Sequence, residues 1–280
     1  MLIFRCLIVL LLLSQSVAFA ATFEIGGQRP AKLIAPERSG KLPLVVMLHG
    51  YTSNSTWASQ YFKIQNLQDS MGFALVLPEG TINSEDKPFW NATPECCDFE
   101  ETGVDDVGYL KSLIDESKNL VNIDSDKVFF MGHSNGGFMS YRMACEHPEL
   151  IKGIISISGA SFRDTELCKG SGAVNILQIH GTADEVIPYE ENERFASPMQ
   201  SVLHFVNKGS CNEPIVQSLA LDLVSNIDLD GDGSDTDLTT WKSCSKGERV
   251  GLWSIQTADH APQVNDNWLR AALSFVGYFE

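Results

Sequence analysis

Six short apolar runs along the chain alternate with longer stretches in which apolar positions recur at helical spacing. The runs predict strands buried on both faces of a sheet, at residues 42–48, 73–77, 128–131, 153–158, 174–179 and 250–255. The longer stretches predict helices at residues 107–120, 137–145, 192–206 and 268–276. Strands that alternate with helices indicate the α/β class, with a mostly parallel central sheet and helices on both faces.

The first twenty residues follow a different pattern. Arg5 precedes an apolar run at residues 7–13, and Ala18-Phe19-Ala20 provides small residues at a cleavage position. This order is typical of a signal peptide, and the apolar run is too short for a membrane anchor. We therefore expect residues 1–20 to be removed from a secreted protein, either extracellular or periplasmic. Residues 21–280 are expected to form a single domain, because no linker divides them.

The charge of the chain limits its partners. The formal net charge is −16, and it becomes −17 when Arg5 leaves with the signal peptide. A strongly negative protein is repelled by nucleic acids and by anionic membrane surfaces, so we expect neither as a partner. A neutral or weakly charged substrate, either a small molecule or an oligomer, fits this charge better.

Six of the seven cysteines lie outside the predicted signal peptide. An even number of cysteines in an exported protein predicts disulfides, although six cysteines allow fifteen pairings. We favour Cys145–Cys168 and Cys211–Cys244, because each bridge would close a loop on one side of the molecule; Cys96 and Cys97 remain as an adjacent pair. A zinc site is the competing interpretation, but the sequence lacks paired Cys-x-x-Cys motifs and histidines at ligand spacing.

The main candidate for chemistry is the pentapeptide Gly132-His133-Ser134-Asn135-Gly136. It follows the apolar run at residues 128–131 and precedes a predicted helix. A strand that enters a glycine-flanked turn with serine at its apex is typical of a nucleophile elbow, where the hydroxyl stands clear of the sheet. The motif alone recurs by chance, but its position between a strand and a helix predicts that Ser134 is a nucleophile.

A serine nucleophile needs an imidazole that removes its proton and a carboxylate that orients the imidazole. With a nucleophile elbow, the acid and then the histidine follow the serine along the chain. His260 lies between the last predicted strand and the last predicted helix, and Asp184 follows the strand at residues 174–179, so we predict these two residues as base and acid. Glu185 and Asp259 are the competing acids. The other histidines beyond the serine are interpreted as packing or surface residues (His147, His204) or as a residue with a backbone role (His180).

Two backbone amides are candidates for stabilising the oxyanion that forms when the serine attacks. The N–H of Asn135 lies at the start of the helix after the elbow, where free amides and the helix dipole favour negative charge. The second donor is expected in Leu48-His49-Gly50-Tyr51-Thr52, after the first predicted strand. Gly50 would allow the turn that directs the N–H of Tyr51, or alternatively that of Thr52, at the carbonyl oxygen.

An acidic loop is a candidate metal site. Asp228, Asp230 and Asp232, followed by Gly233, match the first positions of a twelve-residue calcium loop, but Thr239 occupies the position where the bidentate glutamate is expected. A structural calcium site and a solvated acidic loop both remain open. No cofactor is expected for the chemistry itself.

With these residues assembled, the chain resembles the secreted esterases of the polyhydroxybutyrate depolymerase and feruloyl esterase group, within the α/β-hydrolase fold. The matching segments are residues 48–50, 77–80, 90–91, 96–97, 104–108, 132–142 and 180–189. The resemblance implies a serine esterase without a cofactor, with Ser134, Asp184 and His260 as the triad. The chain departs from such proteins after the histidine, where Ala261-Pro262 replaces an aromatic-proline pair.

Two further groups of residues have both a structural and a functional interpretation. Asp105 and Asp106 are expected to cap the helix that starts near Val107, rather than to contact substrate. Trp90 is predicted to bind substrate. Three other aromatic residues could extend this surface, although core packing explains each of them equally well (Trp57, Tyr61, Phe89).

The sequence therefore predicts a secreted serine carboxylic-ester hydrolase that acts through an acyl-enzyme. Its expected substrates are hydroxybutyrate oligomers, feruloyl or acetyl esters, or similar neutral esters. One alternative is a secreted serine peptidase of the same fold, which would be expected to carry an additional domain or a cap. The other is a non-catalytic binding protein of hydrolase fold, which would be expected to lack a member of the triad.

Overall fold

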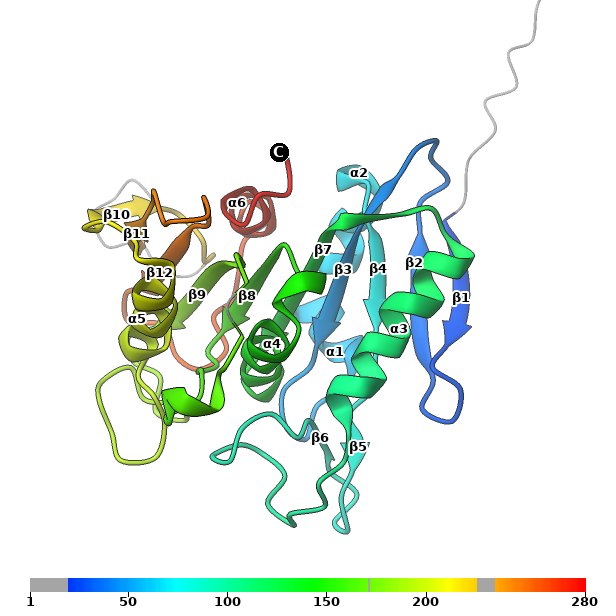
Figure 1. Cartoon of the computed structure of the whole chain (residues 1–280), viewed down its shortest axis with the longest axis horizontal. Helices are drawn as coiled ribbons and strands as arrows, with labels where there is room; N and C mark the ends of the chain where they lie inside the picture. Colours follow the sequence, from blue (N-terminus) through cyan, green and yellow to red (C-terminus); the bar gives the residue numbers. More distant parts are fainter. Residues whose placement is uncertain (1–19, 171, 226–234) are drawn as a thin grey trace, which may run out of the picture.

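The computed structural model describes residues 20–170, 172–225 and 235–280. Ten of its strands form one sheet, in the order β1-β2-β4-β3-β7-β8-β9-β12-β11-β10 (Figure 1). These strands are β1 (Ala21–Ile25), β2 (Ala31–Ala35), β3 (Leu42–Leu48), β4 (Ala74–Leu77), β7 (Ile123–His133), β8 (Gly153–Ile157), β9 (Asn175–Gly181), β10 (Ile215–Leu221), β11 (Thr236–Trp241) and β12 (Val250–Ile255). The short strands β5 (Thr81–Ile82) and β6 (Pro88–Phe89) pair separately.

The centre of the sheet is parallel. Strands β4, β3, β7, β8, β9 and β12 pair in parallel with their neighbours, and these are the six strands predicted from the apolar runs. The outer strands β1, β2, β10 and β11 pair antiparallel. The predicted mostly parallel sheet of the α/β class is therefore confirmed. The outer strands were not predicted, because strands such as β10 are largely exposed and lack a continuous apolar run.

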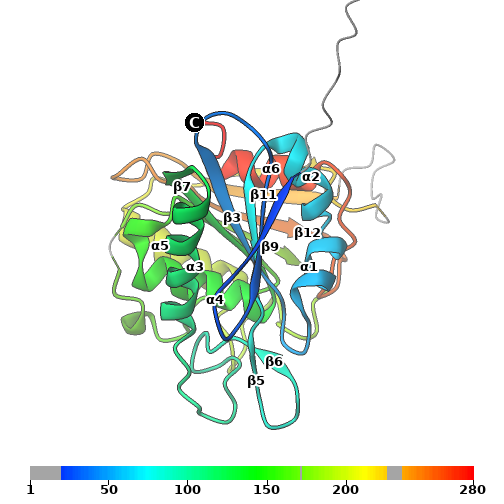
Figure 2. The ribbon, with the colours of Figure 1, turned by 90° about the vertical axis from the view of Figure 1, so that its right-hand side faces the viewer.

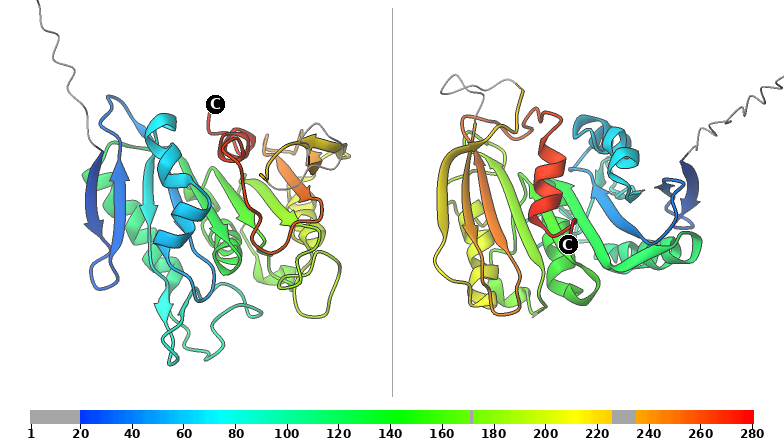
Figure 3. Two further views of the ribbon diagram at one scale, coloured as in Figure 1. Left: turned by 180° about the vertical axis from the view of Figure 1, so that it is seen from behind. Right: turned by 90° about the horizontal axis from the view of Figure 1, so that it is seen from above.

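The six α-helices of the described residues cover the two faces of the sheet (Figures 2 and 3). They are α1 (Ser55–Tyr61), α2 (Ile64–Met71), α3 (Asp106–Leu120), α4 (Asn135–Glu146), α5 (Pro198–Gly209) and α6 (Trp268–Phe275). Helices α3, α4 and α5 lie on one face, and α1, α2 and α6 lie on the other. Helix α5 starts later than predicted, because Ser197 forms a capping box with Gln200.

Side chains alternate between these two faces along the buried strands. In β3, Leu44 and Val46 pack in the cluster beneath α3, α4 and α5, whereas Val45 and Met47 pack in the cluster beneath α1, α2 and α6. Because both faces are covered, neither set of side chains needs to be polar. This arrangement explains why the parallel strands appear in the sequence as continuous apolar runs rather than as alternating patterns.

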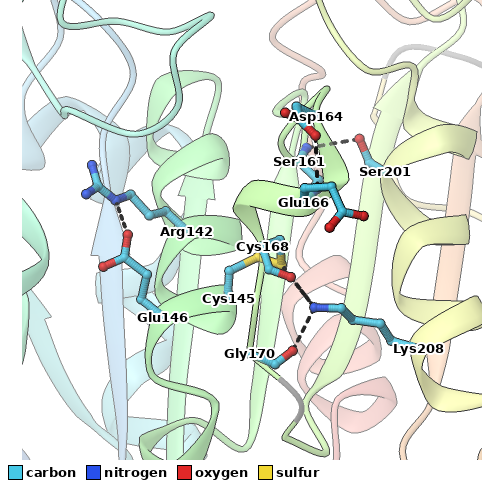
Figure 4. Close-up of a disulfide and its surroundings, with 10 residues drawn as sticks. All are labelled: Arg142, Cys145, Glu146, Ser161, Asp164, Glu166, Cys168, Gly170, Ser201 and Lys208. Carbon is cyan, nitrogen blue, oxygen red and sulfur yellow. Dashed lines mark hydrogen bonds and ion pairs between the residues drawn. A yellow bond between two sulfur atoms is a disulfide. The ribbon is translucent and has the colours of Figure 1, made fainter.

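Three disulfides join the six cysteines of the described residues: Cys96–Cys97, Cys145–Cys168 and Cys211–Cys244. The last two are the pairings favoured from the sequence. Figure 4 shows Cys145–Cys168, which attaches the loop after β8 to the end of α4. Lys208 on α5 donates hydrogen bonds to the backbone carbonyls of Cys168 and Gly170, so the same loop is also attached to α5.

Candidate functional site

Ser134 stands on a sharp turn between β7 and α4. Its backbone has φ 53° and ψ −122°, a conformation that is costly for a residue with a side chain and that recurs at functional sites. A Cβ atom at Gly132 would lie 2.1 Å from the carbonyl oxygen of Gly136, and a Cβ at Gly136 would lie 2.3 Å from that of Leu48. Both flanking positions therefore need glycine, as the elbow pattern predicts.

Asp184 and His260 form a hydrogen-bonded pair beside this turn. Nδ1 of His260 lies 2.8 Å from Oδ2 of Asp184, and the aspartate side chain is buried while the imidazole is partly exposed. The N–H groups of Val186 and Ile187 donate to Oδ1 of Asp184 at 2.9 Å each, which fixes the orientation of the carboxylate. Because Nδ1 of His260 is held by the carboxylate, Nε2 is the nitrogen that remains to receive a proton.

A second histidine also contacts the carboxylate. His180 is fully buried, and its Nε2 lies 3.2 Å from Oδ2 of Asp184 and 2.8 Å from the carbonyl oxygen of Ile187. Burial acts to raise the pKa of Asp184, but the hydrogen bonds from His180 and His260 outweigh it and hold the pKa well below its usual range. The expected backbone role for His180 is therefore wrong, since its side chain contacts the Asp184 carboxylate. Its position four residues before Asp184 is the signal in the sequence.

The hydroxyl-bearing Ser134 and the imidazole of His260 line one open pocket of about 550 Å³. The other lining residues are Gly50, Tyr51, Thr52, Ser53, Asn54, Trp57, His133 and Val186. In the described part of the chain, the Ser134 hydroxyl makes no hydrogen bond to His260. The competing acids Glu185 and Asp259 are both exposed, whereas Asp184 is buried against the histidine.

The two predicted oxyanion donors lie at the start of α4 and in the loop after β3. Asn135 is the first residue of α4, and Tyr51 follows β3 at the edge of the pocket. Neither backbone N–H has a hydrogen-bond partner among the described residues. In contrast, the N–H of Thr52 donates to the carbonyl of Pro88 at 2.8 Å, which leaves Tyr51 as the donor available from this loop.

The predicted aromatic surface divides into two parts. Trp57 lines the pocket, is 38% exposed and stacks on Tyr61, with ring centroids 4.6 Å apart. Trp90 and Phe89 are instead buried in the core. The prediction that Trp90 binds substrate is thus corrected, because its side chain has no exposed surface that a substrate could contact.

Asp105 has the capping role that we expected, whereas Asp106 does not cap the helix and has a different structural role. Asp105 caps α3 by accepting a hydrogen bond from the N–H of Gly108 at 2.7 Å. Asp106 is fully buried, and it pairs with Arg29 at 2.5 Å and accepts from the N–H of Asn91 at 2.7 Å. Neither carboxylate lines the pocket at Ser134.

The three aspartates of the predicted calcium loop and residues 1–19 of the predicted signal peptide fall outside the described residues. Asp228, Asp230 and Asp232 are not described, so the calcium site stays a prediction. Among the residues that are described, no group of three potential metal ligands comes together. Within the same residues, no helix has the length and hydropathy that a membrane span requires.

His133, which directly precedes Ser134 in the pentapeptide, is a contact residue that the sequence did not predict. Its Nε2 donates to the backbone carbonyl of His260 at 2.8 Å, and the two rings lie 4.9 Å apart. Burial, together with the nearby His260, lowers the pKa of His133 to about 4. A neutral His133 therefore supports the loop that carries His260.

This low pKa predicts how stability depends on pH. Between pH 6.5 and 4 the unfolded chain protonates at residue 133 while the folded chain does not, so stability is lost as the pH falls. When the pH falls from 7 to 5, protonation of this histidine in the unfolded chain is expected to lower the free energy of unfolding by about 2 kcal/mol. Chemical denaturation at both pH values should show a smaller loss for His133→Gln than for the wild type. Equal losses in the two proteins would contradict this role.

Comparisons with known proteins place the chain among esterases. A sequence model described as phospholipase/carboxylesterase matches residues 30–218. A putative esterase, NocK, of Nocardia uniformis subsp. tsuyamanensis is 29% identical over 56% of this chain and 44% of its own length. The bifunctional acetylxylan esterase/xylanase XynS20E of Neocallimastix patriciarum is 24% identical, over 88% of this chain and 33% of its own. Feruloyl esterase D of Neurospora crassa is 25% identical over 79% of this chain and 64% of its own length.

The chain thus spans between a third and two thirds of the length of these curated relatives. Among solved structures, an acetyl xylan esterase from Aspergillus awamori superposes with a TM-score of 0.69 at 13% identity, over 92% of this chain and 99% of that one. The structure of esterase PE8 superposes with a TM-score of 0.56 at 16% identity, over 89% of this chain and 97% of that one. These structures confirm the α/β-hydrolase fold, and the feruloyl esterases agree with the resemblance found in the sequence.

Proposed function

Because the chain belongs to the phospholipase/carboxylesterase family of α/β-hydrolases, we propose that it is a secreted serine hydrolase of neutral carboxylic esters. The observation that carries the proposal is the buried Asp184 bound to His260 at the pocket that Ser134 also lines. A buried carboxylate, an imidazole and a serine on an elbow are the three parts that acyl transfer through serine requires.

The reaction begins when Nε2 of His260 takes the proton of the Ser134 hydroxyl and the oxygen attacks the ester carbonyl. Asp184 keeps Nδ1 protonated and stabilises the imidazolium that forms. Collapse of the tetrahedral intermediate releases the alcohol, which takes the proton from His260, and leaves an acyl group on Ser134. Water then attacks the acyl-enzyme while His260 takes its proton. The second intermediate releases the carboxylic acid product, and the Ser134 oxygen takes the proton back from His260.

The negative charge of the tetrahedral intermediate needs donors that are already in position. The N–H groups of Tyr51 and Asn135 are the proposed donors, and each such bond typically contributes on the order of 3 kcal/mol to the transition state. The start of α4 adds the favourable end of the helix dipole at Asn135. Both donors are backbone groups, so they require no reorganisation of side chains during the reaction.

Substrate preference follows from the pocket and the charge. Trp57 and Val186 provide exposed apolar surface beside Ser134, which suits an uncharged acyl or alcohol group. The net charge of −16 disfavours anionic substrates. The names of the relatives support the acetyl and feruloyl esters among the substrates expected from the sequence, which also include hydroxybutyrate oligomers. Three disulfides and the predicted signal peptide support secretion.

A hydrolysis panel tests the proposed function. Purified protein is assayed with aryl acetates and butyrates, methyl ferulate, hydroxybutyrate oligomers, acetylated xylan and a peptide anilide. We expect turnover of esters and none of the anilide. Turnover of the anilide at a rate comparable to the esters would favour a peptidase, and the absence of any turnover would favour a binding protein.

A further inference from the structure

We propose that Trp90 is a positioning residue that aligns both oxyanion donors, Tyr51 and Asn135, with each other; this inference depends on the proposed function. Trp90 is fully buried directly after β6, and it contacts both Asn135 at the start of α4 and the loop that carries Tyr51. It acts through these loops and does not contact the substrate.

The contact with Asn135 is reciprocal. The backbone N–H of Trp90 donates to Oδ1 of Asn135 at 2.8 Å, and Nδ2 of Asn135 donates to the backbone carbonyl of Trp90 at 2.9 Å. Asn135 is itself fully buried, so no water competes for these bonds. The pair fixes the residue whose own N–H is the proposed donor, because the side chain and that N–H share one Cα.

The indole holds the other donor loop. Nε1 of Trp90 donates to the carbonyl of His49 at 2.9 Å, which fixes the peptide group before Gly50. The peptide group after Gly50 is fixed by the His49 ring: Nε2 accepts from the N–H of Gly80 at 2.9 Å, so Nδ1 carries the proton and donates to the carbonyl of Gly50 at 2.7 Å.

That second peptide group contains the donor. In a trans peptide the N–H points away from the carbonyl, so fixing the carbonyl of Gly50 also fixes the direction of the Tyr51 N–H. The rings of His49 and Trp90 pack with their centroids 5.1 Å apart, which keeps the imidazole in this orientation. One tryptophan therefore links the two loops through four hydrogen-bonding groups: its own N–H, C=O and indole N–H, and the imidazole it packs against.

The position of Trp90 is itself fixed, because the backbone of the next residue, Asn91, is held by other hydrogen bonds. Asp106 accepts from the N–H of Asn91 at 2.7 Å, and Arg142 donates to the carbonyl of Asn91 at 2.5 Å. Asp106 is in turn paired with Arg29. Because Trp90 is buried and its neighbour Asn91 is hydrogen-bonded on both sides, small displacements of Trp90 are resisted. Such displacements would weaken the hydrogen bonds from the donors to the oxyanion.

The sharpest test removes only the indole N–H. Replacing Trp90 with 3-benzothienylalanine keeps the size and shape of the ring system and eliminates the donor, and Trp90→Phe is the encoded variant. Trp268→Phe is the matched control, because Trp268 is also buried and donates Nε1–H to a backbone carbonyl, that of Phe62, at 3.0 Å. Each variant leaves one buried carbonyl unpaired and should lose a similar amount of thermal stability.

The kcat values should distinguish the two Trp90 variants from the Trp268→Phe control. With active sites counted by titration, both changes at Trp90 are expected to lower kcat about tenfold to a hundredfold and to change KM by less than about threefold. The affinity for a boronic acid that mimics the tetrahedral intermediate should fall by the same factor as kcat/KM. Trp268→Phe should retain kcat within about threefold.

Equal kcat values for the Trp90 and Trp268 variants, or a loss of thermal stability without a loss of boronic acid affinity, would overturn the proposal. If Trp90→Phe does not fold, the benzothienylalanine protein decides the question. Failure of the proposed function has a different signature, because wild-type protein would then hydrolyse no ester and bind no boronic acid.

Discussion

Replacing Ser134 with alanine is expected to lower kcat/KM toward an aryl acetate by about a millionfold. In the proposed mechanism the hydroxyl oxygen of this residue attacks the ester, so its removal eliminates the acyl-enzyme. The measurement is an initial-rate assay with enough protein to detect residual turnover. Alanine is compatible with the fold, since the Ser134 side chain makes no hydrogen bond in the described part of the chain.

Ser158 provides a matched control for this substitution. It follows β8, as Ser134 follows β7, and its backbone also has a positive φ of 51°. Its N–H donates to the neighbouring strand at the carbonyl of Ile179, as that of Ser134 does at Ile157. Ser158→Ala should keep activity within about threefold of the wild type. Similar activities for the two alanine variants would contradict the assignment of the nucleophile.

Replacing Asp184 with asparagine is expected to lower kcat by about ten-thousandfold with little change in KM. The carboxylate accepts three hydrogen bonds, from two backbone N–H groups and from the ring of His260, and the ring of His180 lies 3.2 Å away. An amide can accept with only one of its two end groups, so the His260 ring would lose the acceptor that keeps Nδ1 protonated. Steady-state kinetics on the variant provide the measurement.

Glu185→Gln and Asp259→Asn are the controls for this acid. Both residues are exposed neighbours of the triad candidates and were the competing acids in the sequence. Their replacement should leave kcat within about threefold of the wild type. A larger effect at either position than at Asp184 would show that the acid has been assigned to the wrong residue.

The parallel strands of the sheet were predictable because burial on both faces gives each strand a run of mostly apolar residues. Residues 42–48 and 250–255 are mostly apolar, and both form strands at the predicted positions. Strand β10 was not predicted, and most of its residues are exposed. Its position depends on pairing with β11, a contact between distant residues that local patterns do not encode.

The three triad candidates were identified because chain order and turn position constrain them. Ser134, Asp184 and His260 each follow a predicted strand, and parallel strands bring such loops to one edge of the sheet. The supporting residues were missed or misinterpreted for the opposite reason. His180 and Trp90 act through burial and through bonds to backbone carbonyls, and residue type alone does not distinguish these roles from ordinary packing.

Covalent labelling tests the central claim most directly. The protein is treated with a fluorophosphonate, digested and mapped by mass spectrometry, while loss of ester hydrolysis is followed in parallel. We predict one adduct per active molecule, on Ser134, with inactivation in proportion to labelling, and greatly slowed labelling in Asp184→Asn. An adduct on a different residue, or full activity after Ser134 is labelled, would contradict the account.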